Sequence, residues 1–129
     1  MIKLTIKVLE MKCLDLSDAP VWSHIPYVKS NYRPVSTYKE CIQSLFQWHN
    51  ETSNVWTMIL INFASLLTCV YIILVLKPPV YWPFILLYTS SLVHLPFTVG
   101  YHLFIPVSQD VCIFWYKLDF SFIFVGTTF

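Results

Sequence analysis

The sequence predicts an all-α membrane protein, and three observations support this fold class. Charged residues make up 12% of the 129 residues, whereas hydrophobic residues make up 57%. A soluble domain usually has about a quarter of its residues charged. Two long segments, 55–76 and 81–105, contain no Asp, Glu, Lys or Arg. At about 1.5 Å per helical residue, each can cross a hydrocarbon core of about 30 Å.

Charge and cysteine usage exclude other classes. The eight Lys and Arg residues form no basic patch with interleaved aromatic residues, so a nucleic-acid partner is not expected. The cysteines lack the CxxC spacing of a zinc knuckle and do not suggest a disulfide framework, so free thiols are predicted. They are Cys13, Cys41, Cys69 and Cys112.

The part of the chain before the first span divides into two segments. Residues 1–36 are predicted to be irregular and cytosolic, because Pro20, Pro26 and Pro34 interrupt any long helix. Residues 37–54 are predicted to form an amphipathic helix of about ten residues with a capping box at Thr37 and Glu40, followed by polar residues at 49–54 that cap the next helix. Such a helix is too short to span a bilayer, so it either lies along the membrane interface or covers a soluble core.

The spans are predicted at residues 55–76, 81–105 and 111–129, and we expect the third to be truncated. Polar residues at positions 62, 65 and 69 form one stripe of the first helix, which should face protein rather than lipid. Six of the eight Lys and Arg residues precede the first span. The positive-inside rule therefore predicts a multi-pass protein with a cytosolic N-terminus, in the plasma membrane or an endomembrane.

The second and third spans contain unusual polar residues. Ser91, His94, Thr98 and His102 fall on one face of a helix, a stripe about 80° wide. This stripe serves either helix packing or substrate contact. Pro96 predicts a kink or a locally satisfied break. Gly100 predicts close packing. An aspartate inside a span costs ~3 kcal/mol to insert, so Asp119 in the third span is a functional candidate.

Two sets of motifs occur around the predicted spans. The motif between the second and third spans is Thr98-x-x-x-His102 followed by Lys117-Leu118-Asp119-Phe120. The segment before the first span contains Arg33-Pro34, Ser44-Leu45-Phe46, His49-Asn50-Glu51-Thr52 and Asn54-Val55-Trp56-Thr57. These motifs, which cover about residues 25–129, resemble those of the progestin and adipoQ receptor family, which is related to alkaline ceramidases, and the earlier set resembles its pre-membrane signature. The sequence departs from the family at Met58, where His is usual, and at Phe122, near which Gly is common.

The resemblance implies a seven-helix transmembrane bundle with a zinc ion near its cytosolic side. His102 falls on a zinc-binding histidine, and Asp119 on the catalytic aspartate that holds or activates a zinc-bound water. Thr98 replaces a nearby serine and keeps its hydroxyl. Glu51 matches the acidic position of the pre-membrane signature, with a structural or substrate-entry role. The family's other zinc-binding histidines come from the seventh helix, which lies beyond this sequence.

Coordination chemistry predicts that the zinc site within this chain is incomplete. A catalytic zinc takes three protein ligands and an open position. His102 and Asp119 supply at most two. His94 could be a third, but it lies about 12 Å from His102 along the helix.

Three functions follow from these observations. The first is a truncated membrane receptor of this family, with membrane lipid around it and a steroid, an adipokine or a ceramide as its ligand. The second is a zinc-dependent hydrolase of a sphingolipid amide, active only if the missing helices are present. The third is a non-catalytic membrane fragment that packs against a partner. Either a homo- or a hetero-oligomer is compatible with the sequence.

Overall fold

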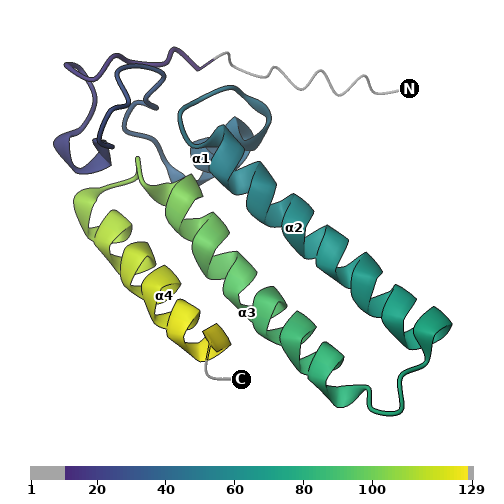
Figure 1. Cartoon of the computed structure of the whole chain (residues 1–129). Helices are drawn as coiled ribbons and strands as arrows, with labels where there is room; N and C mark the ends of the chain where they lie inside the picture. The colour runs from purple at the N-terminus through teal and green to yellow at the C-terminus, as the bar shows by residue number, and fades with distance from the viewer. Residues whose placement is uncertain (1–10, 128–129) are drawn as a thin grey trace, which may run out of the picture.

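The computed structural model describes residues 11–127, and its main elements are helices (Figure 1). They are α1 (Tyr38–Gln43), α2 (Thr52–Tyr71), α3 (Trp82–Phe104) and α4 (Gln109–Thr127). The three long helices lie side by side, and α3 in the middle packs against both α2 and α4. The described residues contain no named strand, only an isolated bridge between Leu14 and Tyr32. The predicted all-α class is therefore confirmed.

The N-terminal segment is irregular over its described residues, as predicted. It contains a short 3-10 helix, η1 (Val21–Ser23), and folds around Tyr32, which is 1% exposed. The Tyr32 hydroxyl donates to the carbonyls of Ile25 and Val28 at 3.2 and 3.1 Å. The first ten residues of the predicted segment 1–36 lie outside the described residues. Figure 1 places the described part at the end of the bundle where α2 begins, α3 ends and α4 begins.

The predicted capping box begins α1. The Thr37 side chain accepts from the Glu40 backbone N–H, and the Glu40 carboxylate accepts from the Thr37 backbone N–H at 2.7 Å. The α-helix ends at Gln43 and continues as a 3-10 helix, η2 (Ser44–Phe46). Its apolar face is only partly buried, because Cys41 is 1% exposed but Phe46 is 79% exposed. The location of this segment at a membrane interface stays a prediction.

Two helices are long and apolar enough, within the described residues, to cross a membrane. They comprise Thr52–Leu76, with mean hydropathy 2.6, and Trp82–Phe104, with mean hydropathy 1.3. The first consists of α2 and a π-helical turn, η3 (Ile72–Leu76), and ends at Lys77 in a left-handed conformation (φ 45°). Helix α4 covers most of the third predicted span. It lies outside these two candidates, and it contains three charged residues, Asp110, Lys117 and Asp119.

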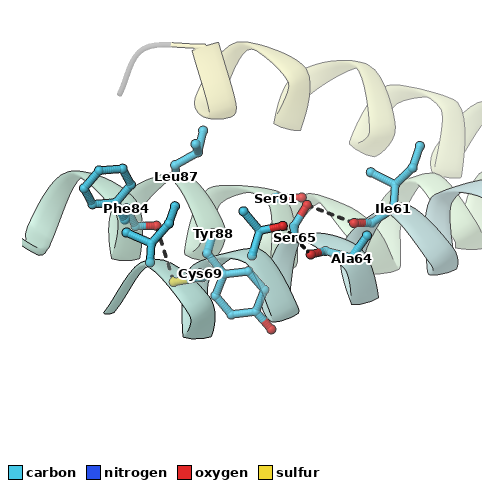
Figure 2. Close-up of a pocket in the computed structure, with 10 residues that line it drawn as sticks. Ile61, Ala64, Ser65, Cys69, Phe84, Leu87, Tyr88 and Ser91 are labelled. Atoms are coloured by element: carbon cyan, nitrogen blue, oxygen red, sulfur yellow. Dashed lines mark hydrogen bonds between the residues drawn. The ribbon is translucent and has the colours of Figure 1, made fainter. Parts of the chain in front are cut away.

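The polar stripe predicted on the first span faces α3. Asn62 and Cys69 are buried, and the Asn62 side-chain oxygen accepts from the Ser91 hydroxyl at 3.2 Å. The Cys69 sulfur lies 3.9 Å from the carbonyl oxygen of Phe84. Figure 2 marks this contact between the two helices with a dashed line. These contacts satisfy polar groups between the helices, which lipid could not do.

The contact between α3 and α4 depends on Gly100. A Cβ atom at this position would overlap the ring of Trp115 in α4. Close packing at Gly100 is thus confirmed, and the neighbouring rings of Phe97 and Phe122 stack with centroids 3.9 Å apart. Helix α3 continues through Pro96 without interruption, so the alternative of a break there is wrong.

We predict that Gly100→Ala lowers the free energy of unfolding by about 1–3 kcal/mol, because overpacking forces the Trp115 ring to move. Thermal unfolding in detergent micelles, followed by circular dichroism, measures the change. Thr89→Ala at an exposed position of α3 is the control and should have little effect. The penalty should shrink in a Trp115→Leu background. An equal penalty in both backgrounds would contradict the proposed contact.

Candidate functional site

The polar stripe of α3 meets Asp119 of α4. The Asp119 carboxylate lies 2.9 Å from His94 Nε2 and accepts from the Thr98 hydroxyl. The Thr98 hydroxyl oxygen is also 2.7 Å from His94 Nε2. His94 and Thr98 are one helical turn apart, so both reach the same carboxylate. The three side chains therefore satisfy one another between two helices, which offsets the cost of burying polar groups in an apolar environment.

His102 takes part in a different contact. Its Nδ1 atom lies 2.7 Å from a carboxylate oxygen of Glu51, directly before α2. Asn54 donates to the same oxygen at 2.7 Å. Because an ionised carboxylate only accepts hydrogen bonds, Nδ1 must carry the proton. In the neutral ring, Nε2 then holds the lone pair.

The carboxyl group of Glu51 is ionised although it is 2% exposed. Burial alone would raise its pKa. Hydrogen bonds from His102 and Asn54, together with the positive charge of Arg33, outweigh burial and hold the pKa below its usual value. The same surroundings keep His49 neutral, because burial and the charge of Arg33 lower its pKa to about 4. Neutral His49 accepts the Glu51 backbone N–H through Nδ1 at 3.1 Å.

Arg33 connects the N-terminal segment to the end of α3 through hydrogen bonds. Its guanidinium is buried and donates to the carbonyls of His102 at 2.6 Å and Leu103 at 2.8 Å. It also donates to the Ser44 hydroxyl at 3.1 Å. The last carbonyls of a helix lack partners within the helix, and a positive charge there is favourable. Burial lowers the pKa of Arg33, which is the only arginine in the sequence.

The two residues that the sequence assigned to one zinc site, His102 and Asp119, have different hydrogen-bond partners. Asp119 contacts His94 and Thr98, whereas His102 contacts Glu51. Sequence reasoning found Arg33 as part of a motif but missed its contact with α3. A single arginine next to a proline was the available signal. Sequence reasoning also did not predict the contact between Glu51 and His102, because the two residues lie 51 positions apart.

The described residues do not by themselves form a zinc site. Among the described residues, no group of three or more His, Cys, Asp or Glu side chains could hold a metal ion. A histidine that binds a metal usually donates its other ring N–H to a carboxylate or carbonyl. The Nδ1 contact with Glu51 is this arrangement and leaves Nε2 for the metal. The donor chemistry of His102 therefore suits zinc, with further ligands required.

The fold and this polar site define a helical membrane protein in which two histidines of α3 contact carboxylates outside that helix. A family model described as haemolysin-III related matches residues 46–128. The chain belongs to this family, the progestin and adipoQ receptors. The sequence-based resemblance is confirmed.

Membrane progestin receptors of vertebrates are among the similar proteins. Membrane progestin receptor gamma-A of Danio rerio is 32% identical over 119 residues, 87% of this chain and 34% of the receptor. Membrane progestin receptor alpha of Homo sapiens is 29% identical over 120 residues, 88% of this chain and 33% of the receptor. Membrane progestin receptor beta of Sus scrofa is 42% identical over 52 residues, 40% of this chain and 15% of the receptor. The chain thus spans about a third of the length of the first two.

We predict that Arg33→Lys lowers the free energy of unfolding by about 2 kcal/mol, because an ammonium cannot reproduce the three hydrogen bonds of the guanidinium. Chemical unfolding in micelles gives this difference. Lys29→Arg makes the reverse exchange at an exposed position of the same segment and should be neutral. Equal stability of Arg33→Lys and the wild type would contradict a stabilising role for the hydrogen bonds of the guanidinium.

Proposed function

We propose that this chain is part of a membrane receptor of the progestin and adipoQ receptor type, and that its ligand is a steroid. The similarity to membrane progestin receptor gamma-A across 87% of the chain carries the proposal. An alignment over 87% of the chain includes both candidate spans, so the proposed receptor would use the two helices together.

A pocket between α2 and α3 supports a ligand of this class (Figure 2). Its volume is about 410 Å³, within the range of small-molecule sites. Most of its surface is apolar, and hydroxyl groups stand on both walls. A steroid has a large rigid apolar body with few polar groups, which suits such a lining. The polar lining residues are Ser65, Thr68, Cys69, Tyr88 and Ser91.

We also propose a zinc ion as a structural or catalytic component of the complete receptor, with His102 as one ligand. When bound, zinc can polarise a carbonyl group and lower the pKa of water. His102 would present Nε2 to it. Asp119 of α4 would supply a negative charge. Its carboxylate contacts His94 and Thr98 in this structure. The hydrolase alternative requires the same residues.

We propose further that the N-terminus lies in the cytosol. Six of the eight Lys and Arg residues precede α2. The end of α3 and the start of α4 lie at the same end of the bundle as the N-terminal segment (Figure 1). His102 and Glu51 would therefore lie at the cytosolic side. The exposed apolar faces of α2 and α3 would contact lipid, further helices of the receptor or a second copy.

We predict that Ala64→Leu weakens binding of radiolabelled progesterone to the chain in lipid nanodiscs by at least about tenfold, because three extra carbon atoms fill the pocket. Val70→Leu enlarges an exposed residue of α2 outside the pocket and should leave binding unchanged. Unchanged binding in Ala64→Leu would exclude this pocket. Turnover of ceramide by the complete receptor, together with an absence of progesterone binding, would favour the hydrolase.

We predict that a peptide tag at the N-terminus resists protease added to intact cells, because positive residues retain this end in the cytosol. The same tag should be digested after the cells are permeabilised, which serves as the control. Digestion in intact cells would reverse the proposed orientation.

A further inference from the structure

The hydroxyl groups on the α2 wall of the pocket between α2 and α3 have fixed hydrogen-bond directions. The hydroxyl oxygen of Ser65 lies 2.8 Å from the carbonyl oxygen of Ile61 (Figure 2), and that of Thr68 lies 2.9 Å from the carbonyl oxygen of Ala64. A backbone carbonyl only accepts hydrogen bonds, so each hydroxyl must donate its hydrogen to the carbonyl one turn earlier. The lone pairs of both hydroxyl oxygens then remain for other partners.

Ser91 on the α3 wall also donates its hydrogen within the protein. Its hydroxyl oxygen lies 3.2 Å from the side-chain oxygen of Asn62. The amide nitrogen of Asn62 lies 3.2 Å from the carbonyl oxygen of Met58. Because this carbonyl needs a donor, it determines which end of the amide is the nitrogen, and the amide oxygen must face Ser91. Ser91 is therefore the donor of the pair, and its oxygen can accept a further hydrogen bond.

The polar lining of this pocket consists mainly of hydrogen-bond acceptors. The thiol of Cys69 also faces a carbonyl oxygen, that of Phe84. Tyr88 is the one polar lining residue whose hydroxyl makes no hydrogen bond within residues 11–127. A hydroxyl that already donates is a stronger acceptor, because successive hydrogen bonds polarise one another. A ligand in this pocket thus meets three hydroxyl oxygens that can accept and one hydroxyl that can donate.

We propose that this pocket recognises a steroid alcohol, whose hydroxyl group donates a hydrogen bond to the hydroxyl oxygen of Ser65 or Thr68. The inference rests on the proposed steroid ligand and names its chemical class. A steroid that carries only ketone groups brings only acceptors, and two acceptors that face each other in an apolar site both lack a partner. Such a ketone gains a hydrogen bond only if a hydroxyl turns away from its own helix, which exchanges one hydrogen bond for another.

The arrangement of the lining suits a ligand with one polar end. Ser65 and Thr68 are three residues apart, so they lie on the same face of α2, and both line the pocket. The lining also includes Ile61, Ile72 and Leu87, which offer apolar contact to a rigid ring system. A small number of polar groups in an apolar pocket fixes the orientation of a ligand and selects its chemistry.

A matched pair of steroids tests the proposal on the full chain in lipid nanodiscs. Pregnanedione and pregnanolone of the same ring configuration differ in one group, which is a ketone in the first and a hydroxyl in the second. Each competes with radiolabelled progesterone. We expect pregnanolone to displace the label at an about fivefold lower concentration than pregnanedione, which is the effect of about one hydrogen bond.

Removal of the accepting oxygens should abolish this preference. Thr68→Val replaces the hydroxyl with a methyl group of similar size, and Ser65→Ala removes the second oxygen. We expect the double variant to bind the two steroids about equally, because pregnanolone loses its acceptors and pregnanedione loses nothing. Thr89→Val makes the same exchange at an exposed position of α3 outside the pocket and should keep the preference. Circular dichroism establishes that each variant keeps its helices, and the comparison in the wild type needs no variant.

The outcomes separate this inference from the proposed function. Equal displacement by the two steroids in the wild type, or an undiminished preference in the double variant, would overturn the recognition of a hydroxyl group but not the steroid ligand. A preference for pregnanedione would show that the lining donates to the ligand, the reverse of the proposal. If neither steroid nor progesterone binds, both the steroid ligand and this inference are wrong.

Discussion

The arrangement of this chain depends on the contact between a buried arginine and the end of a helix. Arg33 belongs to an irregular segment with few regular hydrogen bonds of its own, yet its guanidinium reaches two carbonyls about 70 residues away. The carbonyls at the end of α3 need donors, and the guanidinium needs acceptors after its removal from water. These hydrogen bonds satisfy both groups and hold the N-terminal segment against the helix that carries His102.

A second constraint is that polar groups within apolar helices must find partners on neighbouring helices. The stripe on α3 satisfies this rule at three levels. Its first residues contact α2, the next contact α4, and the last contacts the residue before α2. The pairs are Ser91 with Asn62, His94 and Thr98 with Asp119, and His102 with Glu51. The stripe therefore connects all three long helices.

These contacts connect the fold with the proposed receptor. The pocket between α2 and α3 lies beside the level formed by Ser91, whereas His102 lies at the end of α3 near the N-terminal segment. A ligand in the pocket would contact the same two helices whose ends Glu51 and Arg33 hold. The pocket and His102 therefore share α3, a continuous helix from Trp82 to Phe104.

The sequence by itself determined the helices, the membrane class and the family. Uncharged segments of sufficient length, the capping box at Thr37 and motifs with fixed spacing are local features, and local features persist in any packing arrangement. Only the tertiary structure decided the partners of the ionisable residues. Asp119 contacts His94 rather than His102, and Glu51 contacts His102 across 51 residues. The rotation and depth of packed helices set such pairings, and a linear pattern shows which face is polar but not what lies opposite it.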